Sequence, residues 1–276
     1  MGYFGYYDGT YYKNGELRVP LTDRAIYFGD GVYDAVLGDS GRFYLLNAHL
    51  SRFFQNVKAI GLALPYTPDH LKAIIETLSE GTHGTQFLYL QATRGAPLRE
   101  HAPTQESTHL LVTLTQADAP TTAPLSLIGV EDCRYALCHI KTLNLLPNVL
   151  SAMRARERGA DEAIFLHRGI VREGSRSNIC ILAEGELYTH PTDEHILPGI
   201  MRMRLLETAS RLGIPVHEEP FSERELLRAE GVIVTATTKI ARVANRYSGT
   251  PLPPPSDATV RLVKAMHADF GNFVHD

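Results

Sequence analysis

Lys141 is the residue of this chain whose setting most directly suggests chemistry. It lies in the segment 140–146, IKTLNLL, where most neighbours are apolar. An ammonium group among apolar residues loses its hydration, which favours the neutral amine, and a Schiff-base lysine requires a neutral amine. The alternative is a lysine at a strand end, whose stem covers the core while its head reaches water. Taken alone, the segment favours this alternative.

Glu173 is a carboxylate on a short connection between two apolar strands, so it can be directed inward rather than toward water. Facing a pyridine nitrogen, it would keep that nitrogen protonated and strengthen the ring as an electron acceptor. The residues that follow, Gly-Ser-Arg-Ser-Asn, are also good turn formers. By itself the segment therefore favours an ordinary turn glutamate.

Three further segments carry groups that can bind an anion. A helix that begins at Pro198-Gly199 would present the N–H groups of Ile200 and Met201. Thr237 and Thr238 follow a strand and offer hydroxyls, and Arg52 stands at the edge of an apolar helix face, where it can reach a phosphate. The alternatives are an ordinary helix start, threonines that only pack, and an arginine that only covers apolar surface.

Arg99 and His101 lie two residues apart on a loop between two expected strands. On an extended loop their side chains point the same way. Together they could clamp a carboxylate, with the arginine as a planar fork and the histidine as a second donor. An exposed polar loop is the alternative for any such pair.

Composition sets the class of protein within which these groups act. The chain has 276 residues, a net charge of −4, 44% hydrophobic and 21% charged residues, which is typical of a soluble globular protein. This charge predicts binding to neither nucleic acid nor a membrane surface, and no apolar run is long enough to span a bilayer. Three cysteines without a CxxC pair favour a reducing, cytoplasmic setting, and the scattered histidines predict no metal site.

The chain divides into two expected domains, residues 1–118 and 126–276, joined by a linker at 119–125 that is rich in small residues and proline. In the first domain, apolar residues at helical spacing predict helices near residues 50–60 and 71–78, with strands at 86–93 and 110–114. In the second, strands at 163–166, 170–172, 178–182, 186–189 and 231–236 alternate with helices at 148–157, after Pro198-Gly199 and at 257–267. We expect an α/β protein, with a small α/β sandwich and a larger, barrel-like α/β domain.

Several short motifs occur in an order that is more specific than any of them alone. They are Phe28-Gly29-Asp30-Gly31-Val32-Tyr33, His49-Leu50-Ser51-Arg52, Lys141-Thr142-Leu143-Asn144, Glu173-Gly174-Ser175-Arg176-Ser177-Asn178, Leu197-Pro198-Gly199-Ile200 and Thr237-Thr238. Together they resemble the fold-type IV pyridoxal-phosphate enzymes, across nearly the whole chain. Within that family the sequence is most similar to the D-amino-acid aminotransferases, because the segment leading to Arg99 and His101 looks like their carboxylate trap.

The resemblance implies a role for each candidate residue. Lys141 would carry the cofactor pyridoxal 5'-phosphate as a Schiff base, and Glu173 would face its pyridine nitrogen. The implied cofactor-binding residues are Arg52, Glu173, Ser177, Ile200, Met201, Thr237 and Thr238. The implied substrate-binding residues are Tyr33, Arg99 and His101. Met201 departs from the threonine usual in the family, Arg176 replaces a small residue, and Cys180 stands where an aromatic residue is preferred.

The expected activity is transamination of D-amino acids such as D-alanine or D-glutamate, with 2-oxoglutarate or pyruvate as partner, by a homodimer. The same fold leaves three alternatives open: a branched-chain L-amino-acid aminotransferase, an (R)-amine transaminase and an aminodeoxychorismate lyase. The branched-chain enzymes tend to have a tyrosine at the position of Leu146, and the lyase an alanine-rich segment at Glu173. A pyridoxal-phosphate-binding protein without activity is a further alternative, which the intact lysine and glutamate disfavour.

Overall fold

The computed structural model describes residues 4–13, 15–95, 99–103 and 107–275. The chain folds into two compact units. The first contains Met1–Ala119 and Ile140–Asn144, and the second contains Pro120–His139 and Leu145–Asp276. The short segment that carries Lys141 therefore packs with the first unit, whereas the sequence analysis placed it in the second domain.

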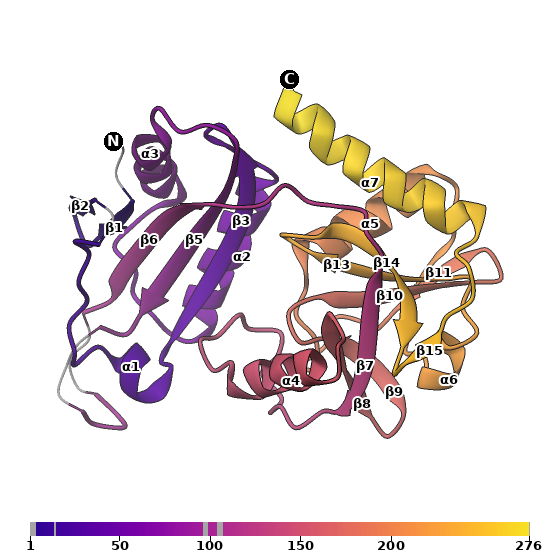
Figure 1. The fold of residues 1–276 in the computed structure, drawn as a ribbon. Coiled ribbons are helices and arrows are strands. Elements are labelled where there is room, and N and C mark those ends of the chain that lie inside the picture. Colours follow the sequence, from indigo (N-terminus) through magenta and orange to yellow (C-terminus); the bar gives the residue numbers. More distant parts are fainter. Residues whose placement is uncertain (1–3, 14, 96–98, 104–106, 276) are drawn as a thin grey trace. The chain divides into compact units, whose positions relative to one another are not determined.

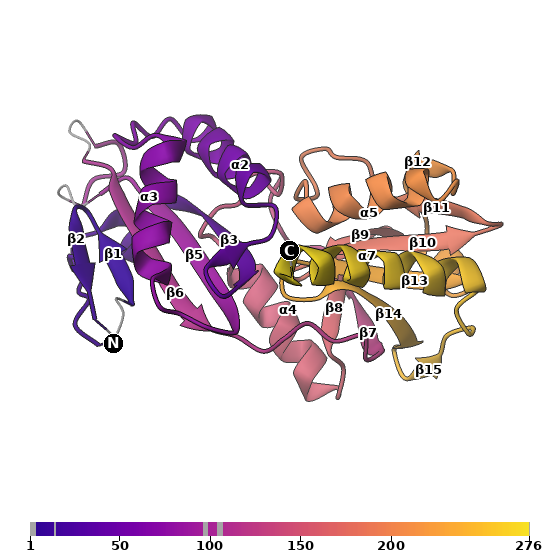
Figure 2. The same ribbon diagram turned by 90° about the horizontal axis from the view of Figure 1, so that it is seen from above.

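The first unit is a sheet covered by helices (Figures 1 and 2). Its strands follow the order β2-β1-β6-β5-β3-β4, and the pairings between these strands are antiparallel. The strands are β1 (Gly5–Tyr7), β2 (Thr10–Tyr12), β3 (Gly31–Asp39), β4 (Arg42–Phe43), β5 (Thr85–Thr93) and β6 (His109–Gln116). The helices are α1 (Arg24–Phe28), α2 (Leu46–Ala59) and α3 (Pro68–Ser79).

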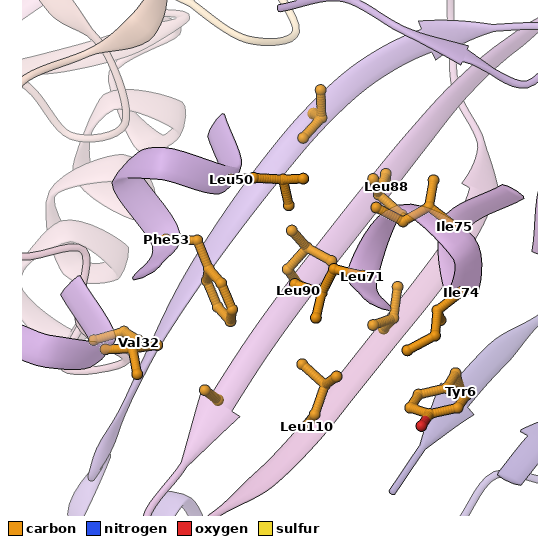
Figure 3. Close-up of a cluster of buried hydrophobic side chains, with 14 of the residues drawn as sticks. Tyr6, Val32, Leu50, Phe53, Leu71, Ile74, Ile75, Leu88, Leu90 and Leu110 are labelled. Atoms are coloured by element: carbon orange, nitrogen blue, oxygen red, sulfur yellow. The ribbon is translucent and has the colours of Figure 1, made fainter. Parts of the chain in front are cut away.

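Helices α2 and α3 share one apolar core with the sheet, which Figure 3 shows in close-up. In α2 the buried residues Leu50, Phe53 and Val57 recur at helical spacing, as the sequence predicted. The start of α3 is fixed by Thr67, whose side chain accepts a hydrogen bond from the His70 N–H. Because both helices bury their apolar stripes on the same face of the sheet, its other face remains available for polar and aromatic side chains.

Strand β5 shows how the two faces differ. Its residues alternate along the strand: Leu88, Leu90 and Ala92 are fully buried in the core, whereas Tyr89 and Gln91 on the opposite face are only half-buried. Strand β3 pairs along the whole of β5 and brings Tyr33 opposite Gln91. The face away from the helices therefore carries Tyr33, the residue implied in substrate binding.

The second unit contains a larger sheet of mixed direction. Its strands are β7 (Leu125–Glu131), β8 (Glu162–His167), β9 (Ile170–Gly174), β10 (Asn178–Ala183), β11 (Glu186–Thr189), β12 (Val216–Glu218), β13 (Gly231–Ala236), β14 (Ile240–Tyr247) and β15 (Thr250–Pro251). Its helices are α4 (Leu146–Glu157), α5 (Ile200–Arg211), α6 (Glu223–Leu226) and α7 (Asp257–His275). Strands β7 and β14 were not predicted from the sequence patterns.

Six of these strands close on themselves like a barrel. They follow the order β10-β13-β14-β7-β8-β9, and β9 pairs again with β10 through Glu173 and Asn178. Apolar side chains from these strands, among them Leu127, Ile164 and Ile179, form one core. The closing pair places Glu173 where two strands meet rather than on a free turn.

Three long helices lie against this sheet. Helix α4 packs on β7 and β8, and α5 and α7 pack on β13 and β14 and on each other. On α4 the side chains of Leu146, Val149, Leu150 and Met153 are exposed, although their spacing is that of an apolar stripe. In the part of the chain that the structure describes, no helix has the length and apolar character needed to cross a membrane.

Candidate active site

Lys141 is held beside strand β3 by backbone hydrogen bonds. The Tyr33 N–H donates to the Lys141 carbonyl at 2.9 Å, and the Leu143 N–H donates to the Gly31 carbonyl at 3.1 Å. The Lys141 ammonium nitrogen lies 4.2 Å from the centre of the Tyr33 ring, and that ring stacks on Tyr89. Lys141 is half-buried. The structure thus places this amine against the Tyr33 ring, whereas Leu146, one of its apolar sequence neighbours, is 68% exposed.

Arg52 lies in a buried cluster on the inner side of α2. Its Nε and Nη2 atoms each donate to an oxygen of Asp34 at 2.8 Å, and His49 Nδ1 lies 2.8 Å from Asp34 Oδ1. The Asp34 side chain is fully buried. Burial alone would raise the pKa of Asp34, but Arg52 and His49 together hold it well below its usual range. The arginine that the sequence suggested as a phosphate ligand is thereby fixed in place by a carboxylate.

His49 and Asp34 had no role in the sequence analysis. Burial lowers the pKa of His49, and repulsion from Arg52 and Lys141 adds to that effect, while Asp34 opposes it. Among the described residues, His49 Nε2 is buried without a hydrogen-bond partner. A signal for these residues does exist, since His49 and Arg52 stand three apart on one helix and Asp34 adjoins Tyr33.

Arg99 and His101 lie on the loop between β5 and β6, and both pack against Phe28 at the end of helix α1. The guanidinium carbon of Arg99 is 5.1 Å from the centre of the Phe28 ring, and the His101 ring is 5.2 Å from the same ring. Both residues are exposed. Within the described ranges, no hydrogen bond, ion pair or ring contact joins Tyr33 to either of them. The structure therefore brings two of the three expected carboxylate-binding residues together and keeps the third beside Lys141.

Glu173 is buried in the second unit and accepts hydrogen bonds on both oxygens. Arg134 Nη1 donates to Oε1, while Asn178 Nδ2 and the Leu197 N–H donate to Oε2 at 3.1 and 3.0 Å. Asp132 in turn accepts from Nε and Nη2 of Arg134 at 3.0 and 2.9 Å. Burial opposes ionisation of Asp132, but the arginine beside it lowers its pKa overall. Arg134 and Asp132 were not predicted from the sequence, because they precede Glu173 by about forty residues and approach it only in the tertiary structure.

Ser177 belongs to the turn between β9 and β10. Its hydroxyl donates to Glu162 Oε1 at 2.8 Å, and the Arg176 N–H donates to the same oxygen at 3.0 Å. On the other carboxylate oxygen of Glu162, Lys239 Nζ lies at 2.9 Å. Lys239 directly follows Thr237 and Thr238, so this buried ion pair joins the two turns that carry the candidate hydroxyls. Neither member of the pair was found from the sequence.

The start of α5 and the turn between β13 and β14 supply donors suited to a phosphate. Gly199 caps α5 without a side-chain hydrogen bond, so the first amides of the helix, at Ile200 and Met201, have no partner within it. A side chain at Gly199 would stand 1.9 Å from Asn178 Oδ1. Within β13, two residues before Thr237, the buried Thr235 hydroxyl has no hydrogen-bond partner among the described residues. These donors fit the phosphate end of pyridoxal phosphate.

One group of potential metal ligands occurs elsewhere in the second unit. The side chains of Asp193, Glu194 and His195 lie within 4.8 Å of one another. Because the three residues are consecutive, the chain itself accounts for their proximity. A surface hollow of about 400 Å³ between α2 and α3 likewise contains none of the candidate site residues.

Comparison with known proteins places the chain in one family. Residues 31–245 match the family described as amino-transferase class IV. The chain is 34% identical over 240 residues to a D-alanine aminotransferase of Bacillus licheniformis, covering 84% of each chain. It is 36% identical over 235 residues to the D-alanine aminotransferase of Listeria innocua, covering 82% of this chain and 81% of that one.

Solved structures show the same fold. A branched-chain aminotransferase from Thermoproteus uzoniensis, solved with norvaline, superposes with a TM-score of 0.91 at 24% identity and covers 98% of this chain and 96% of its own. A second branched-chain amino acid aminotransferase, solved with pyridoxamine 5'-phosphate, has a TM-score of 0.90 at 21% identity, covering 98% of this chain and 95% of that one.

The matches define the class of protein as an aminotransferase. Within that class, this chain belongs to the amino-transferase class IV family. The expected fold, a mixed α/β protein with a barrel-like sheet and a second, smaller sheet, is confirmed.

Proposed function

We propose that this protein transaminates D-amino acids of the D-alanine or D-glutamate type, with 2-oxoglutarate or pyruvate as the keto-acid partner. Its cofactor is pyridoxal 5'-phosphate, as in the class IV family to which it belongs. The observation that carries the proposal is the Lys141 amine, held by the backbone of β3 against the Tyr33 ring. The identity of 34–36% to D-alanine aminotransferases over most of the chain supports the choice of D-amino acids.

Bound pyridoxal phosphate supplies an aldehyde for covalent attachment and a pyridine ring that accepts negative charge. The ε-amine of Lys141 would hold that aldehyde. As a free amine, Lys141 would accept the proton of the substrate α-carbon as a base and would then hold that proton for return as an acid. Tyr33, which contacts the amine, orients it.

Residues of the second unit act on the cofactor's ring and phosphate. Glu173, oriented by Arg134 and Asn178, holds a proton on the pyridine nitrogen. The amides of Ile200 and Met201 and the hydroxyls of Thr237 and Thr238 bind the phosphate. The Ser177 hydroxyl adds a further donor to the phosphate when it turns away from Glu162. In the first unit, Arg52 adds a positive charge that Asp34 orients.

Tyr33, Arg99 and His101 bind the α-carboxylate of the substrate. Because the cofactor is fixed, the side on which the carboxylate is held decides which enantiomer presents its α-hydrogen to Lys141. These three residues therefore set the stereochemistry as well as the affinity.

The visible spectrum of the purified protein tests this proposal. We would record it before and after separate additions of D-alanine, L-leucine and a carboxylate-free (R)-amine. Conversion of the cofactor band to the pyridoxamine form by D-alanine alone is the expected result. Conversion by L-leucine would instead support a branched-chain L-aminotransferase, and conversion by the amine an (R)-amine transaminase; either would overturn the D-amino-acid assignment. Release of pyruvate from aminodeoxychorismate would identify a lyase.

We further propose that the protein is a cytoplasmic homodimer. The exposed stripe of Leu146, Val149, Leu150 and Met153 on α4 is an apolar surface of the kind that subunit contacts cover. The unpaired cysteines Cys133, Cys138 and Cys180 suit a reducing compartment. Sedimentation of the protein, compared with that of a Val149→Glu, Met153→Glu variant, tests the first part; a parent that sediments as a monomer would contradict it.

A further inference from the structure

Helix α1 and its flanking residues form a support for the loop that carries Arg99 and His101. The loop follows β5 and precedes β6, and its described residues 99–103 lie beside α1. Both side chains meet the Phe28 ring, and Arg99 also lies 5.6 Å from the Tyr27 ring centre. A shared aromatic ring therefore sets the mutual position of the two side chains.

Arg24 holds the backbone of this loop. Its Nη1 donates to the Glu100 carbonyl and its Nη2 donates to the His101 carbonyl at 3.3 Å. Its guanidinium carbon lies 4.6 Å from the centre of the Phe28 ring. Arg24 is only 4% exposed, as is found for arginines that are paired with a carboxylate. One buried guanidinium thus contacts both the loop and the ring on which the loop's side chains lie.

The position of Arg24 is itself fixed by charge and by the backbone. Its Nε donates to Asp30 Oδ2 at 2.7 Å, and Arg94 Nε donates to the same oxygen at 3.0 Å. The Arg24 N–H donates to the Gly95 carbonyl at 2.9 Å. Asp30 lies between Arg24 and Arg94 and fixes the orientation of the Arg24 guanidinium group. In this orientation Nη1 and Nη2 of Arg24 face the carbonyls of Glu100 and His101.

The base of the loop is closed by close backbone packing. Gly95 has φ +77°, and a side chain there would stand 1.7 Å from the Ser107 carbonyl oxygen. Thr93 and His109, which end β5 and begin β6, both contact Asp23 Oδ2, at 2.8 and 3.1 Å. The loop is therefore anchored near its two ends, and Arg24 and Phe28 contact its described residues 99–101.

We propose that Arg24 is a positioning residue for substrate recognition: by binding the Glu100 and His101 carbonyls, it sets Arg99 and His101 to receive the carboxylate of the amino acid and so determines the preference for carboxylate-bearing amines. This inference rests on the proposed role of Arg99 and His101. It assigns to Arg24 no contact with the substrate and no part in proton transfer.

Steady-state kinetics of the holoenzyme with D-alanine and 2-oxoglutarate test the inference in Arg24→Met and Arg24→Lys variants. Hydroxylamine, an amine without a carboxylate, serves as the second probe, and its reaction with the bound cofactor is followed by absorbance. Arg24→Met should raise the KM for D-alanine by about tenfold or more, because two charged hydrogen bonds to the loop are lost. Its kcat and its rate constant with hydroxylamine should stay within about threefold of the parent values. Arg24→Lys should recover part of the loss.

Arg18→Met is the matched control, because Arg18 also donates to two backbone carbonyls in the first unit but is exposed. Arg18→Met should leave the KM for D-alanine and the rate constant with hydroxylamine unchanged. An unchanged KM in Arg24→Met, or equal losses with D-alanine and hydroxylamine, would overturn the inference. Should Arg24→Met fail to fold, Arg24→Lys carries the same test, and a KM equal to that of the parent would again overturn it.

Arg99→Ala separates this inference from the proposed function. If Arg99→Ala raises the KM for D-alanine while Arg24→Met does not, only the role of Arg24 is wrong. If Arg99→Ala itself leaves the KM unchanged, the assignment of the carboxylate-binding residues is wrong, and the role of Arg24 falls with it.

Discussion

Lys239 and Glu162 form a buried ion pair, in which Lys239 Nζ lies 2.9 Å from Glu162 Oε2. The Glu162 side chain is fully buried and that of Lys239 is 10% exposed. On its other oxygen, Glu162 accepts from Ser177. Ile240, the next residue after Lys239, has φ 56°, a conformation that is unfavourable for a β-branched residue. The ion pair thus connects the two turns to which we assign phosphate-binding hydroxyls. The turn that precedes Ile240 is the strained one.

Removing one member of this pair should destabilise the protein strongly. Lys239→Met leaves the Glu162 charge buried without its partner, which costs about 3–5 kcal/mol and should lower the melting temperature by at least about 6 °C. The double variant Glu162→Gln, Lys239→Met should recover most of this loss, because neither charge remains. Arg204→Gln, which breaks the more exposed pair with Asp269, is the control and should cost about 1 kcal/mol or less. Equal losses of stability in Lys239→Met and in the double variant would contradict the assignment of Lys239 and Glu162 as a buried ion pair.

His49 should make stability depend on pH. Its pKa is lowered in the folded protein by burial, so below about pH 6.5 the unfolded chain binds a proton that the folded chain does not. Stability should therefore fall as the pH decreases from 7 to 5, by up to about 1.4 kcal/mol per pH unit. Asp34, whose pKa is also lowered in the folded state, adds a loss below about pH 4.

Urea unfolding between pH 7 and 5 measures the contribution of His49. In His49→Gln the slope should decrease, whereas His83→Asn, at an exposed histidine of the same unit, should keep the slope of the parent. An unchanged slope in His49→Gln would mean that another group accounts for the acid sensitivity.

Gly199→Ala should weaken cofactor binding. The added side chain would stand 1.9 Å from Asn178 Oδ1, so Asn178 must move, and with it one of the donors to Glu173. We expect the Kd for pyridoxal phosphate to rise by about tenfold, which corresponds to the loss of about one hydrogen bond to a charged group. Absorbance titration of the apoprotein measures this.

Gly271→Ala is the control for that substitution. Gly271 lies in α7, and a side chain there would meet no atom within 4 Å. The alanine should stabilise the helix by about 0.5–1 kcal/mol and leave the Kd unchanged. Equal affinity in the two variants would rule out a role for the close approach of Gly199 to Asn178.

Lys141→Ala should abolish turnover of D-alanine. Loss of a positioned acid–base group alone lowers the rate by about 10²–10⁴-fold, and loss of the covalent link to the cofactor adds to this. Lys58→Ala, at an exposed lysine in the last turn of α2, should keep the parent rate. Turnover by Lys141→Ala at the parent rate would falsify the proposed mechanism.

The sequence by itself determined the elements whose signals are local. The apolar periodicity of α2 and α3 predicted both helices, and the β-branched run Gly231–Ala236 predicted β13 with the bounds that the structure shows. The ordered set of motifs from Phe28 to Thr238 indicated the family, because their order and spacing resemble those of the fold-type IV enzymes. The departures from the family pattern at Met201 and Arg176 were also recognised from the sequence alone.

Only the tertiary structure decided which distant residues meet. Strands β7 and β14 escaped the sequence analysis, yet they pair with each other in parallel and complete the closed sheet. The closure of this sheet allows Arg134 to pair with Glu173 and Lys239 to pair with Glu162. In the first unit, the fold likewise buries Asp34 between His49 and Arg52. No local pattern encodes such pairs, because the free energy that brings them together comes from burial of apolar surface across the whole unit. The sequence therefore identified the groups that do chemistry, and the tertiary structure decided which residues hold them in place.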